Sequence, residues 1–263
     1  MNPNFNLKRE ISNKLTCGIS EHANTPFHFH SQIEIYLVLS GQIEVIVNDK
    51  RKILTPGELS VAFSYDAHGY RNVKDSRAIY LIIPTDLCGE FLPELNKRSS
   101  GSPFINDAGT VKTVSDAMHA LLRGGNDISK RGYIYTILGA LLDQMPEGGQ
   151  SQPKGYGFSP DMLIFISHKF RDELTLDTVA KEFGYNPSYL SRAFRETFGI
   201  SFVKYLTMLR LREAVLLLRS GDRSVTECAM ESGFGSMRSF YRAFREEFGA
   251  SPKKLFEEYK SKK

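Results

Sequence analysis

Two blocks of sequence occur twice in the C-terminal part of the chain, and this duplication restricts the fold more than any other feature. The block 180–185 (AKEFGY) returns 49 residues later as 229–234 (AMESGF). The block 192–201 (RAFRETFGIS) returns 50 residues later as 242–251 (RAFREEFGAS). Because only two copies are present, the sequence predicts a duplicated structural module rather than a solenoid of many repeats.

Each copy has the pattern of a helix-turn-helix unit. A first helix ends at Gly184 or Gly233, and glycine suits the left-handed backbone found where helices stop. Pro187 opens the second helix of the first copy, where a missing N–H group costs nothing. The predicted helices span residues 176–183, 187–198, 225–232 and 236–248.

The second helix of each copy has one apolar face and one polar face. The apolar face repeats every four residues, through Leu190, Phe194 and Phe198, and through Phe240, Phe244 and Phe248. A helix anchored by Phe that presents Arg, Ser and Tyr is typical of a recognition helix in the major groove, so we expect double-stranded DNA as a partner. The candidate DNA-binding residues are Asn186, Ser188, Tyr189, Ser191, Arg192, Arg195, Ser236, Arg238, Ser239, Tyr241, Arg242 and Arg245.

A long helix is predicted between the two copies, over residues 201–219, with Ser201 as its N-cap. At 1.5 Å per residue it is about 28 Å long. Two recognition helices on one side of DNA lie about 34 Å apart, so this helix suits such a separation if the DNA bends somewhat.

The run 232–252 resembles the signature of the AraC/XylS family of bacterial transcription regulators. That signature has Gly-Phe, small residues, Phe-x-Arg-x-Phe and then Gly-x-Ser-Pro, and the resemblance covers about residues 159–260. It implies seven helices with two helix-turn-helix units, contacts from Arg192 and Arg242 to bases or backbone, and RNA polymerase as a further partner. The first copy departs from the pattern by ending in Gly-Ile-Ser-Phe.

The first hundred residues are rich in β-branched and aromatic runs that are separated by turn signals. The predicted strands span residues 33–39, 43–47, 51–54, 59–63 and 77–83. Short strands of this kind favour an antiparallel barrel or sandwich.

Three histidines and one glutamate in this half have a spacing similar to that of the cupin barrels. His28 and His30 alternate on one strand, Glu34 follows, and His68 lies farther along. In metal-binding cupins the matching positions hold a divalent ion, and three imidazoles with one carboxylate suit iron, manganese, zinc or nickel. The second cupin motif departs from its pattern, with Phe63 and Tyr65 where Pro and Gly are usual.

Three roles therefore stay open for these side chains. They bind a divalent metal, contact an organic effector, or form hydrogen bonds inside the barrel. The sensor domains of AraC-type regulators often keep the histidine pattern without a metal, so no cofactor is required. The candidate effector-binding residues are His28, His30, Glu34, Tyr65, His68 and Tyr70, where paired tyrosines suit a sugar-like or aromatic ligand.

A helical hairpin is predicted after the strands, in residues 107–146. We expect its apolar stripe to form a homodimer interface, with packing against its own barrel as the alternative. The stripe consists of Met118, Leu121, Leu122, Ile134, Ile137, Leu138 and Leu141. The Gly- and Pro-rich segment 147–158 follows and is predicted to be a flexible linker.

The formal charge of +4 lies entirely beyond this linker. Residues 1–158 hold 16 basic and 16 acidic side chains, whereas residues 159–263 hold 18 and 14. There is no membrane-length apolar run and the N-terminus lacks the core of a signal peptide, so we expect a cytoplasmic protein without membrane contact. The three cysteines are widely spaced and indicate neither disulfides nor a zinc site.

The sequence thus predicts a multidomain β + α protein with a cupin-like barrel (1–106), the hairpin (107–146), the linker (147–158) and an all-α DNA-binding domain (159–263). The predicted function is a transcription regulator, not an enzyme, that responds to a small-molecule effector in the barrel. One alternative is a cupin metalloenzyme fused to a DNA-binding domain. Another is a regulator without an effector, controlled by its abundance.

Overall fold

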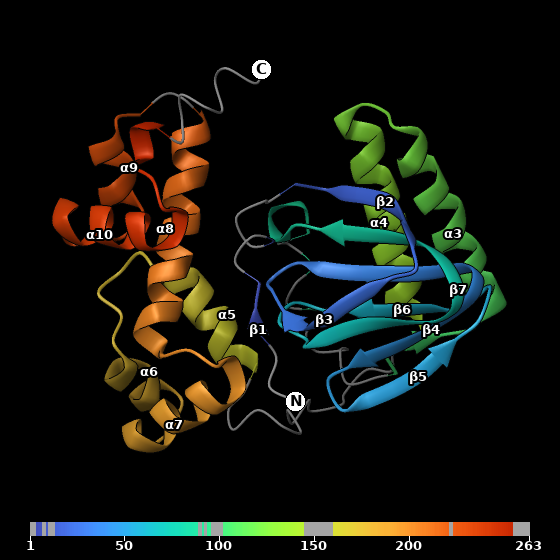
Figure 1. The fold of residues 1–263 in the computed structure, drawn as a ribbon, viewed down its shortest axis with the longest axis horizontal. Helices are drawn as coiled ribbons and strands as arrows, with labels where there is room; N and C mark the ends of the chain where they lie inside the picture. The colour runs from blue at the N-terminus through green and yellow to red at the C-terminus, as the bar shows by residue number, and fades with distance from the viewer. Residues whose placement is uncertain are drawn as a thin grey trace. The chain divides into compact units, whose positions relative to one another are not determined.

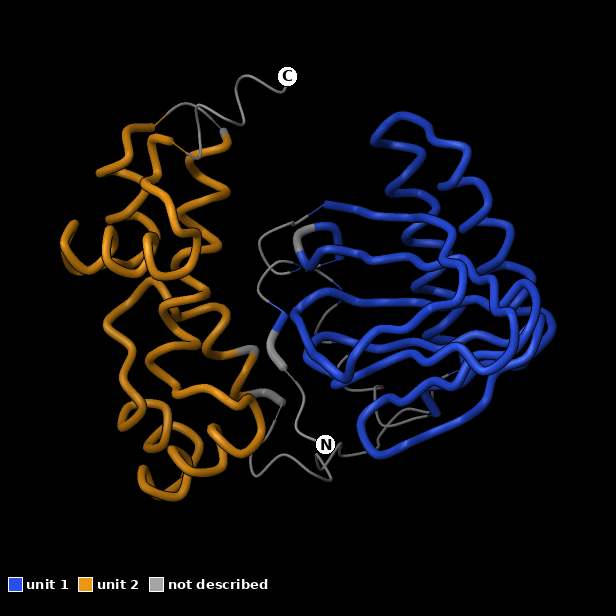
Figure 2. The backbone as a smooth tube through the Cα atoms, viewed as in Figure 1, with its two compact units in different colours: residues 1–155 blue, residues 156–263 orange. Residues whose placement is uncertain are grey.

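The computed structural model describes residues 4–6, 9, 14–88, 91, 94–95, 102–144, 160–220 and 223–254. The chain divides into two compact units, residues 1–155 and 156–263 (Figure 2). Most of the predicted linker 147–158 precedes this boundary, and the whole linker lies outside the described residues.

The first unit is built on an eight-stranded, mainly antiparallel sheet, in which β1 and β3 form a parallel pair (Figure 1). Its path is β1-β3-β7-β4-β6-β8, with β2 paired to β7 and β5 paired to β4. The long strands β4 and β7 pair along most of their length and connect the other strands. The strands are β1 (Asn4–Phe5), β2 (Thr16–Glu21), β3 (Asn24–Phe29), β4 (Ile33–Val47), β5 (Lys50–Leu54), β6 (Leu59–Ala62), β7 (His68–Ile83) and β8 (Phe104–Ile105).

Two strands predicted separately, 33–39 and 43–47, are halves of the single strand β4. Gly41 lies at their junction with a φ of +73°, and the register with β7 shifts around it. A Cβ atom on Gly41 would lie 2.2 Å from the carbonyl oxygen of Lys74, so only glycine fits. The shift changes which alternate residues point inward: Tyr36 before it and Ile43 after it belong to the same interior cluster.

The hairpin consists of α3 (Ala108–Arg123) and α4 (Asp127–Asp143). Asp107 caps α3 by accepting a hydrogen bond from the Thr110 N–H, and Asn126 caps α4 in the same way from Ser129. Both helices pack on one face of the sheet (Figure 1), and their apolar residues form one core with the strands.

Six of the seven residues predicted to form a dimer interface are buried within their own unit, and the seventh, Leu122, is partly buried against the same core. Met118, Ile134 and Ile137 are fully buried within their own unit, in one cluster with Ile35 and Leu81 of the sheet. Helical periodicity revealed a buried face, but not which surface covers it. The alternative, packing against the barrel, is what the structure has.

The second unit contains six helices with described bounds, and the described residues 252–254 are also helical. All five predicted helices agree with the structure to within one residue at each end, and the helix predicted over residues 187–198 agrees at both ends. Ser201 caps α8 as expected, since its Oγ accepts from the Lys204 N–H at 3.2 Å. The helices are α5 (Pro160–Lys169), α6 (Leu176–Glu182), α7 (Pro187–Phe198), α8 (Phe202–Ser220), α9 (Val225–Glu231) and α10 (Met237–Phe248).

Phenylalanines on the inner faces of α7 and α10 form much of the core of this unit. Phe194, Phe240 and Phe244 are fully buried, and the Phe194 ring meets the buried Tyr205 ring of α8 at 5.3 Å. This confirms the predicted apolar faces and leaves the polar faces turned outward. No helix in the described parts of the chain is long and apolar enough to cross a membrane.

Candidate functional site

The turns of the two helix-turn-helix units have matching backbones. Gly184 and Gly233 have φ values of +69° and +91°. In each turn the next residue closes the end of the first helix: the Tyr185 N–H donates to the Ala180 carbonyl, and the Phe234 N–H donates to the Ala229 carbonyl, at 2.8 and 3.1 Å. The sequence duplication therefore corresponds to a structural duplication.

Two predicted DNA-binding residues cap the recognition helices. Asn186 Oδ1 accepts hydrogen bonds from the N–H groups of Ser188 and Tyr189, at 2.9 and 3.2 Å. Ser236 Oγ accepts from the Ser239 N–H at 3.2 Å. Satisfying free N–H groups at a helix start stabilises that helix, so Asn186 and Ser236 have a structural role that the sequence prediction did not assign.

The arginines on α7 and α10 are exposed, and their guanidinium groups have no hydrogen-bond or ion-pair partner in the described part of the chain. Elsewhere in this unit Arg171 pairs with Glu213, and Arg223 pairs with Glu231. Unpaired guanidinium groups can donate to phosphates and to guanine edges without first breaking an ion pair. The unpaired set is Arg192, Arg195, Arg238, Arg242 and Arg245.

The other predicted DNA-binding side chains surround these arginines. Tyr189 and Tyr241 are 41% and 46% exposed. Tyr241, together with Arg242, Arg245 and Glu246, lines a shallow open hollow on α10. Ser188 and Ser191 are exposed on α7, whereas Ser239 is half-buried.

Sequence patterns missed the residues that join α5 and α8. The Arg210 side chain donates from Nε to the Phe170 carbonyl at 2.7 Å and from a terminal nitrogen to the Asp172 carbonyl at 2.9 Å. Arg171 pairs with Glu213 of α8. These contacts join positions about 40 residues apart, and nothing in the local pattern of Arg and Glu could have indicated them.

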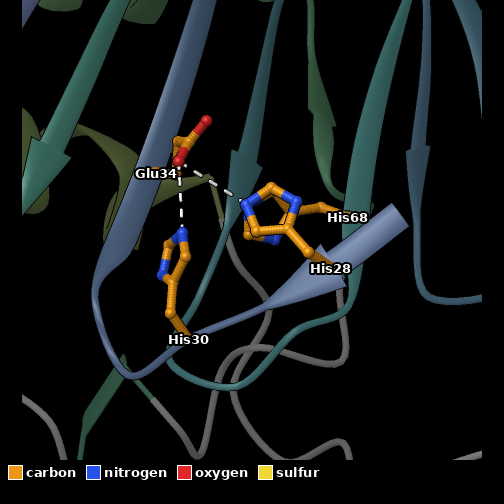
Figure 3. Close-up of side chains that lie close together, drawn as sticks. All are labelled: His28, His30, Glu34 and His68. Atoms are coloured by element: carbon orange, nitrogen blue, oxygen red, sulfur yellow. Dashed lines mark hydrogen bonds and ion pairs between the residues drawn. The ribbon is translucent and has the colours of Figure 1, made fainter. Parts of the chain in front are cut away.

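The predicted histidine cluster is assembled in the first unit (Figure 3). His28 of β3 lies opposite His68 of β7 in the strand register, while His30 and Glu34 flank the turn into β4. All four side chains are buried, and one ligand atom from each lies within 4.8 Å of the others. Nε2 of His30 is 3.2 Å from Glu34 Oε2, and Nε2 of His68 is 3.6 Å from it.

Backbone carbonyls orient the three imidazoles. Nδ1 of His28 lies 2.8 Å from the Pro26 carbonyl, and Nδ1 of His68 lies 2.8 Å from that of Asp66. Nδ1 of His30 faces the Gln32 carbonyl at 3.2 Å. A carbonyl only accepts, so each Nδ1 carries a proton and Nε2 is the atom left to bind within the cluster. Metal-binding histidines are commonly fixed in this way.

The electrostatics of the cluster favour a positive charge between the imidazole Nε2 atoms and the Glu34 carboxylate. Burial opposes ionisation of Glu34, yet the neighbouring His30 and His68 imidazoles hold the pKa of its carboxyl well below the usual value. Burial likewise disfavours the charged form of His68, but the Glu34 carboxylate outweighs it and raises the His68 pKa. Burial and the two neighbouring imidazoles lower the pKa of His28 to about 4. A proton on an imidazole or a bound cation would each supply such a charge.

The four donors fit a divalent cation after a small contraction. Ligand atoms about 2.1 Å from one ion lie at most about 4.2 Å apart, compared with the 4.8 Å limit measured across this cluster. Three imidazole nitrogens and one carboxylate oxygen suit zinc, iron, manganese or nickel.

Aromatic and hydroxyl groups extend the cluster into the sheet interior. Tyr70 stacks on Tyr36 with ring centroids 4.1 Å apart, and its ring lies 5.9 Å from that of His68. The buried hydroxyls of Tyr70 and Ser60 have no hydrogen-bond partner among the described residues. Tyr36 and Ser60 were not predicted, although the alternation of Glu34 and Tyr36 along β4 places both on one face.

Tyr65 stands where the cupin pattern has glycine, and it adopts a backbone conformation that favours glycine. Its φ is +68°. Its N–H donates to the His30 carbonyl at 2.8 Å, which connects this turn to the histidine cluster. The Asp66 carboxylate accepts from the Phe63 N–H at 2.9 Å and stabilises the same turn.

The cysteines take no part in either site. All three are free, and Cys88 and Cys228 are buried. Burial raises the pKa of the Cys17 thiol to about 11, so it is not an activated nucleophile at neutral pH.

Two family models match this chain. One is described as a helix-turn-helix domain and covers residues 179–258, which include both turns and both recognition helices. The other is described as a cupin domain and covers residues 16–84, which include the whole histidine cluster.

Several known proteins are similar to the chain. The transcriptional activator RhaS of Escherichia coli is 25% identical over 247 residues, covering 89% of this chain and 88% of that protein. The Msm operon regulatory protein of Streptococcus mutans is 26% identical over 152 residues, covering 56% of this chain and about half (54%) of that protein. The solved structure of ToxT from Vibrio cholerae is 11% identical with a TM-score of 0.43, over 92% of this chain and 97% of that one.

Proposed function

We propose that the chain is a transcription regulator of the AraC/XylS type with a cupin-like N-terminal domain, which the two matching family models and the similarity to RhaS support. In this proposal it binds specific double-stranded DNA through α7 and α10. Binding is controlled by a small molecule held in the first unit. RhaS is described as an activator, and we propose activation for this chain as well.

The main support for this proposal is that both recognition helices present exposed arginines that have no ion-pair partner in the described part of the chain. Arg192 and Arg242 occupy the same position in two helix-turn-helix units, on helices whose opposite faces are buried. The connecting helix α8 has 19 residues. Its length of about 28 Å is close to the spacing of about 34 Å between successive major grooves. Two neighbouring half-sites on one side of the DNA therefore suit this domain.

Selection of bound fragments from random double-stranded DNA tests this function. We expect enrichment of a site with two conserved segments about one helical turn apart. Affinity for that site should fall steeply as salt rises, because several phosphate contacts release counterions. Recovery of no preferred sequence, or a flat response to salt, would contradict sequence-specific DNA binding.

The proposed effector site is the interior of the sheet between the histidine cluster and the Tyr36–Tyr70 pair. Buried hydroxyls without partners, such as those of Tyr70 and Ser60, are costly unless a ligand or water satisfies them. A hydroxyl-rich, sugar-like ligand matches these groups. A thermal-shift screen with sugars and small acids should find a compound that raises the Tm, because a ligand selective for the folded state stabilises it. A regulator without an effector would show no such compound.

A divalent metal in the His28–His30–Glu34–His68 cluster would provide a Lewis acid and fix the ends of an oxygen-rich effector. The orientation of the three imidazoles by backbone carbonyls supports this occupancy. Metal analysis of protein purified without an affinity tag tests it, with His30→Ala as the matched variant. We expect stoichiometric metal in the wild-type protein and its loss in the variant. Absence of metal from both proteins would contradict metal occupancy of the cluster.

The same four ligands favour one rival function, a metalloenzyme fused to a DNA-binding domain. We propose that the chain is not an enzyme, since RhaS and the Msm operon regulatory protein, to which it is similar, are named as regulators. If metal-loaded protein transformed the compound found in the thermal-shift screen, the rival would be correct. Unchanged compound after incubation with stoichiometric protein supports the role of a sensor.

We also propose that the chain divides into a barrel (1–106), a hairpin (107–146), a linker (147–158) and a DNA-binding domain (159–263). The protein is further proposed to form a homodimer, to contact RNA polymerase and to be cytoplasmic. A homodimer has to use surfaces other than the buried hairpin stripe. Light scattering of the full chain tests the dimer directly.

A further inference from the structure

Lys204 lies in the first turn of α8 and bridges to the C-terminal half of α10. Its Nζ atom is 3.2 Å from Glu246 Oε1 and 3.5 Å from Glu247 Oε2. Lys204 and Glu247 are partly buried, whereas Glu246 is mostly exposed. One lysine therefore neutralises two carboxylates beside the arginines of α10.

Without this lysine, the carboxylates would have an obvious alternative partner. Glu246 is four residues after Arg242, a spacing at which oppositely charged side chains meet on a helix surface. Glu246 also shares the shallow hollow on α10 with Arg242 and Arg245. In the structure Glu246 turns to Lys204, and the Arg242 guanidinium has no partner in the described part of the chain.

We propose that Lys204 is a positioning residue for DNA recognition by α10. It holds Glu246 and Glu247 on α8, so that Arg242 stays free for DNA and the phosphates do not face two uncompensated carboxylates. The inference rests on the proposed function, because it requires α10 to contact DNA.

The first copy provides an internal comparison. Glu196 has the same relationship to Arg192 that Glu246 has to Arg242, four residues later on the recognition helix. No cation of the described chain lies within ion-pair distance of Glu196. Equivalent arginines on the two recognition helices are therefore each followed by a glutamate, but only the glutamate of α10 is paired with a lysine. Glu196→Gln is thus a matched control for Glu246→Gln.

The test is a thermodynamic cycle on full-length protein and the DNA site recovered by random selection. The variants are Lys204→Met, Glu246→Gln/Glu247→Gln and the triple combination, with Lys204→Arg as the charge-conserving variant. We expect Lys204→Met to raise the Kd about 3- to 10-fold, through charge repulsion near the phosphates. The glutamine pair should change the Kd little in the wild-type background and restore affinity in the Lys204→Met background.

Two further readouts separate positioning from a structural role. Lys204→Met should change the Tm little, because methionine preserves the packing of the partly buried aliphatic chain and ion pairs accessible to solvent contribute little to stability. In footprints, its effect should be confined to the half-site that Arg242→Ala also affects. Lys204→Arg should bind as wild type. Glu196→Gln should alter affinity by the same factor in the wild-type and Lys204→Met backgrounds.

Each outcome decides the question. If the glutamine pair does not rescue Lys204→Met, the lysine contacts phosphate directly and the inference is wrong. If Lys204→Met binds as wild type, the inference is wrong while the proposed function stands. If the wild-type protein selects no DNA, the proposed function fails, and the inference fails with it.

Discussion

A Cβ atom on Gly233 would lie 2.7 Å from the Cα atom of Arg171, so these two residues touch backbone to backbone. The equivalent glycine of the first copy, Gly184, has no atom within 4 Å of such a Cβ position. Two turns of matching backbone therefore have different surroundings. The second turn packs against the backbone of Arg171, two residues after α5, and the first turn faces open space.

This difference predicts unequal effects of the same substitution. Gly184→Ala should cost about 1–2 kcal/mol, the strain of alanine in the left-handed region. Gly233→Ala should cost more than about 3 kcal/mol, since the methyl group also collides with the Arg171 backbone. Urea unfolding of the two variants measures both values. Equal losses would show that the Gly233–Arg171 contact adjusts freely.

The sequence predicted both glycines, because each lies where a helical pattern stops. It gave no sign that only one of them is packed. The contact depends on Arg171, 62 residues earlier in the chain, and on the ion pair and hydrogen bonds that connect this region to α8. Local patterns determine the backbone of a turn, whereas the tertiary fold determines its neighbours.

The hairpin core provides a second prediction. Ile137→Ala should destabilise the first unit by about 2–5 kcal/mol, because it removes a fully buried side chain from the core shared with the sheet. The folded variant should keep the oligomeric state of the wild-type protein. Chemical unfolding and light scattering provide the two measurements. A change of oligomeric state at unchanged stability would restore the dimer-interface interpretation of this stripe.

The buried tyrosine of the first unit provides a third prediction. Tyr70→Phe should change stability little, because it removes a buried hydroxyl that makes no hydrogen bond of good geometry in the described chain, although the Glu34 carboxylate lies near it. It should weaken binding of the effector found by thermal-shift screening by about 1–3 kcal/mol. Tyr133→Phe in the half-buried part of the hairpin is the control. A wild-type effector response from Tyr70→Phe would exclude its hydroxyl from the effector site.

The pKa shifts of the histidine cluster predict how metal binding depends on pH. Glu34 raises the pKa of His68, so a divalent ion has to displace a proton from this imidazole. The proton competes more strongly as pH falls, so the affinity for zinc should increase between pH 6 and pH 8. His28 does not contribute to this slope, because its pKa of about 4 leaves it neutral throughout. Calorimetric titration at both pH values tests the direction, and an affinity independent of pH would contradict it.

Much of the histidine cluster was predictable from spacing. His28 and His30 alternate on a strand, and the cupin resemblance connected them with Glu34 and His68. The structure adds the reason why His68 joins, since β3 and β7 pair with His28 opposite His68. Tyr36 was missed because an inward tyrosine within an apolar run resembles any other core residue.

The recognition helices were predicted almost to the residue, because caps, proline and the four-residue phenylalanine repeat all agree there. The same pattern was unable to distinguish arginines that are free from those that are paired. That distinction depends on Lys204 and Glu213 of α8, whose partners lie about 42 residues away along the chain.

The central claim is that both recognition helices contact DNA, and Arg192→Ala and Arg242→Ala test it most directly on the selected site. Each variant should lose about 1–3 kcal/mol of binding free energy, or about 5- to 150-fold in Kd. Footprints should place the two losses in different half-sites about one helical turn apart. Unchanged affinity in either variant, or both losses in the same half-site, would contradict a regulator that binds DNA through two equivalent helices.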